Sequence, residues 1–289
     1  MANINKRVSD NVEGLYYVDS TCINCGVSRH YAPTVFGDNG NCAYVLKQPQ
    51  NPAETLATQQ ALLACPVAAI GTTAKIDLQS AVNSFPIHLD GPVFINGFNH
   101  RDSYGAHSYF IRTDNGNWLI DSPRFTAHLV EKFMRMGGLD YIFLTHCDDV
   151  SDASKYARHF KAKRIIHKLD SHAQRDAEII LDGETDHHYS QARIVFTPGH
   201  TRGHLVLLWE DKYLFTGDHF AWLADAERFG SFRDACWYSW GVQIQSVAKL
   251  RDFTQVQWVL PGHGKWGQIT QGQFGQIIES AVETMKNQI

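Results

Sequence analysis

Long apolar runs, an excess of positive charge and a secretory leader are all missing from this sequence. The longest apolar stretch, residues 61–71, is interrupted by Pro66 and falls short of the roughly 18 residues that a membrane-spanning helix needs. The 26 basic and 30 acidic side chains give a formal net charge of -4, so no nucleic-acid-binding surface is expected. Residues 1–14 contain no apolar signal segment. A cytoplasmic protein without a nucleic-acid or membrane partner is therefore the expectation.

Cysteine is concentrated at one end of the chain and histidine towards the other. Four of the six cysteines, Cys22, Cys25, Cys42 and Cys65, lie within the first 65 residues. In a reducing compartment such a group indicates a metal site or inert thiols rather than a set of disulfides. Most of the 15 histidines follow residue 85. The two parts of the chain are therefore expected to carry different chemistry.

A change of sequence pattern near residues 72–90 predicts two domains, residues 1–80 and residues 85–289. Beyond the change, apolar strand-like runs alternate with segments of helical periodicity, which is typical of a layered α/β architecture. The predicted helices of this part cover residues 126–136, 153–160, 171–180, 242–251 and 273–286.

Four of the apolar runs end in residues that bind metals. The run YIFLT ends at His146, RIVFTPG at His200, YLFTG at Asp218 and QWVLPG at His263. A strand that ends in such a residue places a polar side chain at the edge of a rigid sheet, where α/β sheets gather their sites. One such residue is usually a solvated side chain, but four in one chain predict a shared divalent metal.

These motifs resemble the ordered signature of the metallo-β-lactamase superfamily, T-H-x-H-x-D-H, P-G-H-T-x-G-H, T-G-D and G-H. The matching segments are THCDDVSD (145–152), PGHTRGH (198–204), TGDH (216–219) and PGHG (261–264). The resemblance runs from about residue 90 to residue 289 and implies an α/β fold, the αββα sandwich, with a metal site at one edge of its two sheets. It also implies metal ligation by His146, His200 and His263, with Asp218 as a shared carboxylate and His204 as a supporting residue.

The first motif departs from the superfamily pattern. Asp148 stands where the second histidine belongs and Ser151 where the last one belongs. A site richer in oxygen is therefore expected, with one divalent metal (zinc, iron or manganese) or two, held by His146, Asp148, His200, Asp218 and His263. The remaining acidic residues, Asp149 and Asp152, are candidates for the catalytic carboxylate that orients a water molecule and accepts its proton. The alternative is that both cap the following helix.

Residues 16–71 resemble a ferredoxin module of the bacterial 4Fe–4S type, a small α+β domain. The segments CINCGVSRHYAPTVFG (22–37) and CPVAAIG (65–71) match the pattern C-x2-C-x2-C, A-P and a distant C-P followed by A-I. The resemblance implies that Cys22, Cys25 and Cys65 hold an iron–sulfur cluster, with Ser28 in place of the third cysteine. The fourth ligand is then Cys42 or the oxygen of Ser28, or a three-iron cluster forms. The alternatives are zinc on the four cysteines and thiols that only pack in the core.

The two resemblances imply three functions. The first is a metal-dependent hydrolase of the glyoxalase II or esterase type that acts on a small-molecule substrate. The second is an iron-dependent oxidoreductase or electron-transfer protein with a redox partner. The third is a sensor or scaffold that has lost catalysis. The aromatic residues between TGD and PGHG are expected mostly to pack in the core, with one or two facing the substrate: Phe220, Trp222, Phe229, Phe232, Trp237, Tyr238 and Trp240.

Overall fold

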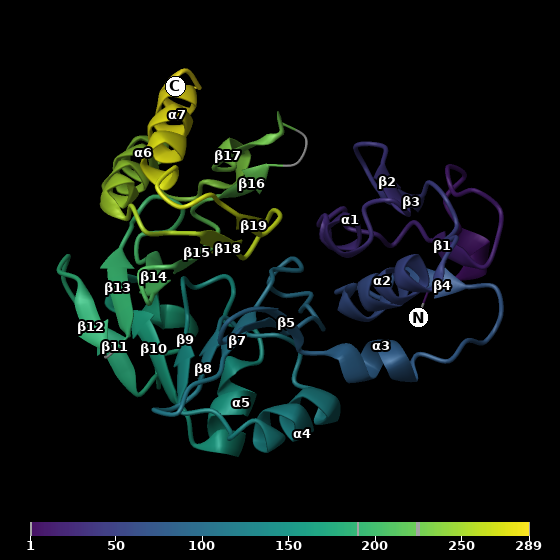
Figure 1. Cartoon of the computed structure of the whole chain (residues 1–289), viewed down its shortest axis with the longest axis horizontal. Coiled ribbons are helices and arrows are strands. Elements are labelled where there is room, and N and C mark those ends of the chain that lie inside the picture. Colours follow the sequence, from purple (N-terminus) through teal and green to yellow (C-terminus); the bar gives the residue numbers. More distant parts are fainter. Residues whose placement is uncertain (1, 190, 224–225, 289) are drawn as a thin grey trace. The chain divides into compact units, whose positions relative to one another are not determined.

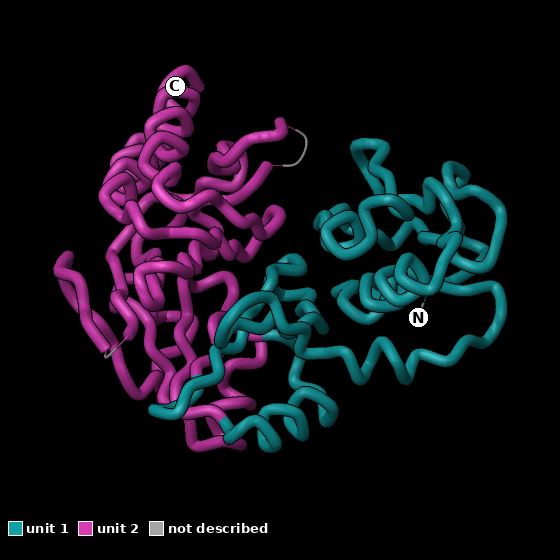
Figure 2. The backbone as a smooth tube through the Cα atoms, in the orientation of Figure 1, with its two compact units in different colours: residues 1–117, 123–138 teal, residues 118–122, 139–289 magenta. Residues whose placement is uncertain are grey.

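The computed structural model of the chain describes residues 2–189, 191–223 and 226–288 (Figure 1). The chain divides into two compact units (Figure 2). Unit 1 comprises Met1–Asn117 and Pro123–Gly138, and unit 2 comprises Trp118–Ser122 and Leu139–Ile289. The predicted domains, 1–80 and 85–289, follow the change of sequence pattern. The compact units instead keep residues 85–117 together with the amino-terminal segment.

Unit 1 consists of short strands and helices. Strands β1 and β4 pair antiparallel, as do β2 and β3, and β5, β6 and β7 form an antiparallel ladder. Helix α2 begins with a proline in its first turn, and the Asn51 side chain accepts a hydrogen bond from the Glu54 backbone N–H, which caps the helix. In chain order the elements are η1 (Ile4–Lys6), β1 (Tyr16–Val18), α1 (Val27–Tyr31), β2 (Phe36–Asp38), β3 (Ala43–Val45), α2 (Pro52–Ala64), β4 (Ile70–Thr72), α3 (Gln79–Ser84), β5 (Ile87–Asp90), β6 (Val93–Ile95), β7 (Tyr109–Ile111) and α4 (Ala127–Arg135).

The described strands of unit 2 form three groups. Strands β8 to β11 pair in parallel, a second group has the order β12-β13-β14-β15-β18-β19, and β16 and β17 form a separate antiparallel pair. In chain order the elements are β8 (Trp118–Ile120), β9 (Tyr141–Phe143), α5 (Ala153–Phe160), β10 (Lys163–His167), η2 (Lys168–Ala173), β11 (Ile179–Leu181), β12 (His187–Tyr189), β13 (Ala192–Phe196), β14 (Leu205–Trp209), β15 (Tyr213–Gly217), β16 (Ala221–Leu223), β17 (Arg228–Gly230), η4 (Arg233–Ala235), α6 (Trp240–Lys249), η5 (Leu250–Asp252), β18 (Trp258–Pro261), β19 (Gly267–Gln268) and α7 (Phe274–Lys286).

The layers of unit 2 follow from the alternation of side chains along its strands. Val206 and Leu208 of β14 point to the side covered by α6 and α7 and join one apolar core with residues of both helices. On the other side, Trp209 of β14 contacts Trp118 of β8, and Phe196 of β13 stacks on His167 of β10. The two sheets therefore face each other, and α5 packs against β10. The predicted αββα sandwich is confirmed (Figure 1).

One predicted helix is wrong. The sequence predicts a helix over residues 171–180, but this segment begins in the short helix η2 and ends in strand β11. Ile179, Ile180 and Leu181 pair in parallel with β10, because β-branched residues fit the pleated surface of a sheet. The helices predicted over 126–136, 153–160, 242–251 and 273–286 are found as α4, α5, α6 and α7. None of the helices among the described residues has the length and apolar character needed to cross a membrane.

Candidate metal centre

The first predicted ligand, His146, is fully buried beyond the end of strand β9. Thr145 Oγ1 lies 2.9 Å from His146 Nδ1 and 3.0 Å from both carboxylate oxygens of Asp121. A threonine hydroxyl has one proton, so the network assigns it as donor to Asp121 and acceptor from the Nδ1–H of His146. Nε2 of His146 then carries the lone pair, and this atom is buried without a hydrogen-bond partner among the described residues. A metal ligand requires this arrangement.

The second predicted ligand, His200, follows β13 through a tight turn. Gly199 has φ of 146°, and a Cβ at this position would lie 2.3 Å from the Cα of Gln243 in α6, so the turn requires glycine. The carbonyl oxygen of His200 accepts hydrogen bonds from the backbone N–H groups of Trp237 and Tyr238, each at 3.0 Å. Nε2 of His200 is buried and lacks a hydrogen-bond partner within the part of the chain that the structure describes.

The other two strand ends lie side by side because their strands are parallel neighbours. β15 pairs with β18, with Gly217 opposite Pro261, and the backbone N–H of Gly262 donates to the Gly217 carbonyl at 2.8 Å. Asp218 and His263 therefore leave adjacent strands at the same edge of the sheet. The site thus draws on four loops that are far apart in the sequence.

Four of the five predicted ligands meet at one carboxylate oxygen, and Asp148 lies beside two of them. The described groups with metal-ligand spacing contain His146, Asp148, His200 and Asp218 but not His263. Asp218 Oδ2 lies 3.6 Å from Nε2 of His146, 3.6 Å from Nε2 of His200 and 3.7 Å from Nε2 of His263. Asp148 Oδ2 lies 3.8 Å and 3.6 Å from the first two of these nitrogens. These separations are too long for hydrogen bonds, but they suit ligands of one cation, because donors about 2.1 Å from a tetrahedral zinc lie about 3.4 Å apart. The donor set fits a divalent metal.

Burial and charge act against each other at these ligands. Burial lowers the pKa of His146 to about 4, which keeps the imidazole neutral and able to bind a metal. Burial also lowers the pKa of His200, but the carboxylates of Asp148 and Asp218 outweigh it and raise the pKa overall. The neighbouring imidazole of His200 lowers the pKa of Asp148 to about 2. For Asp218 burial raises the pKa, and the three surrounding histidines reverse that effect, so the carboxylate stays ionised.

The side chain of Asp149 lies at the same site and does not cap the helix that follows. Its side chain is buried, and both carboxylate oxygens lack a hydrogen-bond partner among the described residues. One of its oxygens lies within 4.8 Å of donor atoms of His146 and Asp218. Burial, followed by the charges of Asp218 and Asp121, raises its pKa well above the ordinary range. A carboxylate in this position needs a proton or a second cation. The two described groups with metal-ligand spacing, His146–Asp148–His200 and His146–Asp149–Asp218, share His146.

Asp152 has different surroundings from Asp149. It is the N-cap residue of α5, although its side chain makes no capping hydrogen bond, and its carboxylate forms an ion pair with Lys155 at 2.7 Å. It is absent from the described groups that have metal-ligand spacing. Asp149 therefore lies at the metal centre and Asp152 pairs with a lysine, although the sequence offers both as candidates for the catalytic carboxylate.

Three buried residues of the site were not predicted as ligands or catalytic groups. His204 is buried with Nδ1 3.1 Å from Thr197 Oγ1, and its ring stacks between those of His146 and His219, in the supporting place that the resemblance implies. The other two are Asp121, which directly follows the apolar run WLI, and Asp170, which lies three residues after the run RIIH. The strand-end pattern that identified His146 also fits Asp121, whereas Asp170 lies within η2 and carries no such signal.

The aromatic segment divides into buried and exposed residues. Phe220 and Trp240 are buried in the core beneath α7, and Phe229 packs against them. Trp237 is 67% exposed, and its ring lies 6.3 Å from the ring of His200. Phe232 is exposed as well and approaches Gly264, the residue after His263. Exposed aromatic side chains therefore flank the metal centre on two sides.

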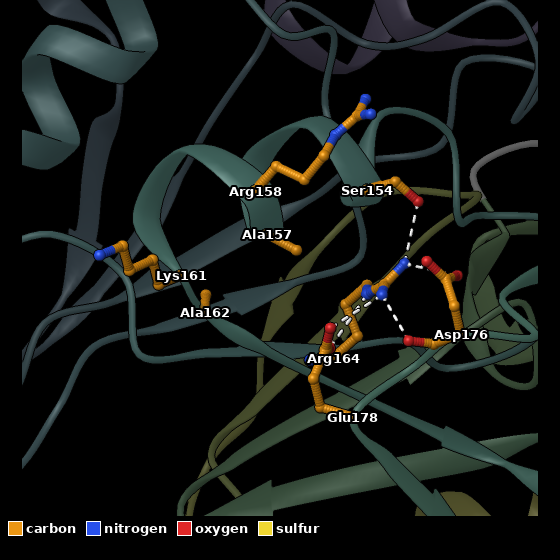
Figure 3. Close-up of a pocket in the computed structure, with 8 residues that line it drawn as sticks. All are labelled: Ser154, Ala157, Arg158, Lys161, Ala162, Arg164, Asp176 and Glu178. Atoms are coloured by element: carbon orange, nitrogen blue, oxygen red, sulfur yellow. Dashed lines mark hydrogen bonds and ion pairs between the residues drawn. The ribbon is translucent and has the colours of Figure 1, made fainter.

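A separate cavity of about 490 Å³ lies between α5, β10 and the segment before β11 (Figure 3). Arg164 points into it, with hydrogen bonds to Ser154, Gln174, Asp176 and Glu178. These bonds occupy all three guanidinium nitrogens, so the arginine ties β10 to α5 and to the segment before β11. None of the predicted site residues lines this cavity.

The amino-terminal cysteines gather in unit 1. Cys22, Cys25 and Cys65 line one pocket together with Ser28, and all six cysteines of the chain are free thiols. No three cysteine sulfurs lie within 4.8 Å of one another among the described residues. Thiolates around a single zinc ion would lie about 3.8 Å apart, so the alternative of one zinc on the cysteines is not supported. A multi-iron cluster binds each thiolate through a different iron and spaces them more widely.

A loop that follows β6 covers part of this pocket within unit 1. The hydroxyl of Tyr104 donates a hydrogen bond to the carbonyl of Ile23, which lies between the first two cysteines. A Cβ on Gly105 would lie 3.0 Å from both Cys25 Sγ and Pro66 Cγ, so the backbone of the loop rests directly on this side of the pocket. Because of this contact, the loop around residues 104 and 105 belongs to the same compact unit as the cysteines, although it is far from them in the sequence.

The chain is similar to known proteins in both of its parts. Residues 18–72 match the family model "4Fe-4S single cluster domain of Ferredoxin I". A Drosophila melanogaster protein described as "Beta-lactamase-like protein 2 homolog" is 28% identical over 55% of this chain, and the match covers 59% of that protein's length. The chain therefore spans less than two thirds of this relative.

Solved structures match the larger part of the fold. The DIM-1 metallo-β-lactamase exposed to ceftazidime is 20% identical, with a TM-score of 0.54, over 68% of this chain and 95% of that one. TMB-1 is 19% identical, with a TM-score of 0.56, over 69% and 97%. A metallo-β-lactamase from Pontibacter korlensis is 17% identical, with a TM-score of 0.53, over 69% and 97%. The chain thus joins a segment of the single-cluster ferredoxin type to a metallo-β-lactamase fold.

Proposed function

We propose that the protein is a metal-dependent hydrolase that cleaves esters or thioesters, as glyoxalase II and related esterases do. The observation that carries this proposal is the convergence of His146, His200 and His263 on one carboxylate oxygen of Asp218. Two of the three imidazoles have a buried Nε2 at this place that lacks a hydrogen-bond partner among the residues the structure describes. A divalent cation held there acidifies a coordinated water molecule and polarises a carbonyl oxygen, which is the chemistry that ester hydrolysis requires.

The residues around the cation supply acid–base chemistry and access. Asp148 has a 45% exposed side chain, so we place the substrate entrance on its side of the site. Asp149 is buried behind it, and burial raises the pKa of its carboxyl well above the ordinary range, so it holds a proton more tightly than an exposed carboxylate does, which suits a general base. Asp152 faces Lys155, and we therefore assign the base to Asp149.

The exposed aromatic residues indicate the kind of small molecule that would bind. The backbone N–H of Trp237 holds the carbonyl of His200, which fixes an exposed indole beside a metal ligand. Phe232 lies near Gly264 on the side of His263. Aromatic surfaces of this kind bind apolar groups, so we expect substrates with an apolar acyl or leaving group.

Turnover and metal content test this proposal together. The protein loaded with zinc, iron(II) or manganese is assayed with a p-nitrophenyl ester, an acylglutathione thioester, a chromogenic β-lactam and a phosphodiester. We expect ester or thioester turnover that stops on chelation and returns when the metal is added back. Asp218→Asn lowers both metal content and turnover, whereas His188→Ala, at an exposed histidine of β12, changes neither. Turnover of the lactam or phosphodiester alone would refute ester specificity, and turnover of none of the four would refute the hydrolase.

A second candidate function is favoured by the match of residues 18–72 to a single-cluster ferredoxin family. In this case a cluster on the cysteines exchanges electrons with a redox partner, and the metal centre holds iron. Visible absorbance that bleaches on dithionite would support this function. Anaerobically purified protein that is colourless and contains neither iron nor sulfide would rule it out.

A further inference from the structure

The four amino-terminal cysteines differ in the backbone groups that face their sulfur atoms. Cys22 Sγ accepts a hydrogen bond from the backbone N–H of Asn24 at 3.4 Å, and Cys65 Sγ accepts one from Ala69 at 3.3 Å. Hydrogen bonds of this polarity stabilise the negative charge on thiolates that hold an iron–sulfur cluster. The backbone around these two residues is therefore arranged for thiolates.

Cys42 has the opposite surroundings. Its sulfur lies 3.2 Å from the carbonyl oxygen of Ala43 and 3.8 Å from that of Asp19, and its one proton is donated on this side, most closely to Ala43. The side chain of Cys22 is its other hydrogen-bond neighbour, and burial, followed by the charge of Cys22, raises the pKa of the Cys42 thiol to about 12. A thiolate bound to iron has no proton to donate, and its charge would be repelled by two carbonyl oxygens. Cys42 also does not line the pocket, although the next residue, Ala43, does. These contacts suit a protonated thiol that packs in the core.

Ser28 occupies the place that the missing cysteine leaves. It is in the first turn of α1 and is 8% exposed, and it lines the pocket together with Cys22, Cys25 and Cys65. The rest of the lining is largely apolar, with side chains such as those of Val18 and Ile70. The pocket therefore offers three sulfur donors and one oxygen donor in an apolar surrounding.

We propose that Cys22, Cys25 and Cys65 hold an iron–sulfur cluster whose fourth corner faces the Oγ of Ser28, with Cys42 outside the ligand set. A serine oxygen is a harder ligand than a thiolate and gives up its proton far less readily. The iron at this corner is therefore held more weakly than the other three. Gly105 covers the side of Cys25, which leaves the corner at Ser28 as the one that exchanges iron.

Iron exchange makes the proposal testable on the full chain. The protein is reconstituted anaerobically with ferrous iron and sulfide, treated with the one-electron oxidant ferricyanide and desalted. Ferricyanide takes one electron from the four-iron cluster, one ferrous ion leaves, and three ferric ions remain with the four sulfides. Iron is then expected to fall from about four to about three per chain at constant sulfide, with the EPR signal of an oxidised three-iron cluster.

Two variants separate Ser28 from Cys42. Ser28→Cys is expected to keep all its iron under the same treatment, because a fourth thiolate replaces the oxygen. Cys42→Ser is expected to lose iron as the unmodified chain does, whereas Cys22→Ser, the control for a cluster ligand, reduces iron and sulfide together. Ser28→Ala is expected to hold only the three-iron form, so the test does not depend on the cysteine variant folding.

Four results would overturn the proposal. The first is loss of the cluster or of its fourth iron in Cys42→Ser before oxidation, which would make Cys42 a ligand. The second is equal retention of iron by the unmodified chain and Ser28→Cys. The third is a stable four-iron cluster in Ser28→Ala. The fourth is zinc without sulfide, or no metal at all, in the reconstituted chain and in Ser28→Cys. None of these results bears on the hydrolase, whose ligands are other residues.

Discussion

Asp170 connects the two loops that carry the first pair of metal ligands. Its Oδ2 accepts hydrogen bonds from the Cys147 backbone N–H at 3.2 Å and from Thr201 Oγ1 at 2.5 Å, and its Oδ1 accepts one from the Gly203 backbone N–H at 2.9 Å. Cys147 follows His146, and Thr201 follows His200. The carboxylate is buried, so these bonds are not replaced by water. We therefore infer that Asp170 sets the distance between two metal ligands that it does not touch.

Replacing Asp170 should weaken both the fold and the metal centre. A buried hydrogen bond to a charged group contributes roughly 1.5–3 kcal/mol, so Asp170→Asn, which turns one acceptor oxygen into a donor, should lower the free energy of unfolding by about 2 kcal/mol. Loss of a group that orients ligands lowers metal affinity roughly 10- to 100-fold. Gly203→Ala should act in the same way, because its Cβ would lie 2.8 Å from the carboxylate carbon of Asp170.

Urea unfolding of the metal-free protein and metal titration against a chromophoric chelator measure the two effects separately. Asp182→Asn is the matched control, since it makes the same change at an exposed carboxylate that pairs with Lys168, and it should alter neither quantity appreciably. If Asp170→Asn lowers the unfolding free energy but leaves metal affinity within about twofold of the original, Asp170 supports the fold alone. If neither quantity changes, the assigned hydrogen bonds are wrong.

Two further predictions concern the same centre. Gly262→Ala should reduce metal affinity at least tenfold, because its Cβ would lie 2.7 Å from a carboxylate oxygen of Asp218. Gly241→Ala is the control, because among the described residues no atom lies within 4 Å of the new Cβ. It should leave metal affinity unchanged and stabilise α6 by up to about 1 kcal/mol. Equal metal affinities in the two variants, measured by the same titration, would contradict this. Burial raises the pKa of Asp121 from 3.8 to about 8, so the folded state keeps a proton that the unfolded state has lost. This carboxyl by itself therefore makes the unfolding free energy of the metal-free protein fall as pH rises from about 4 to about 8. The buried imidazoles of His146 and His219, whose pKa values burial lowers from 6.5 to about 4 and about 3, act in the opposite direction below about pH 6.5. Urea unfolding at several pH values should therefore show a more positive slope between pH 4 and pH 8 in Asp121→Asn than in the unmodified chain, and identical slopes would contradict the raised pKa of Asp121.

The sequence predicted those residues of the candidate site that a local sequence pattern identifies. An apolar run that ends in histidine or aspartate is a strand with a polar residue at its end, whatever the rest of the chain does. This pattern identified His146, His200, Asp218 and His263 before any coordinates. Helical periodicity was a poorer guide over residues 171–180, where η2 and strand β11 replace the predicted helix because Ile179, Ile180 and Leu181 pair with β10.

The amino-acid sequence by itself determined the kinds of donor in each part of the chain, and the order of its motifs pointed to the sandwich fold. Only the tertiary structure decided which of several equivalent residues takes part. Asp149 faces a metal ligand and Asp152 faces a lysine, although both lie in the same short loop. Cys42 meets carbonyl oxygens and Cys65 meets an N–H group, although both are buried thiols. The direction of such side chains depends on contacts with segments distant in the sequence, and composition and spacing do not contain this information.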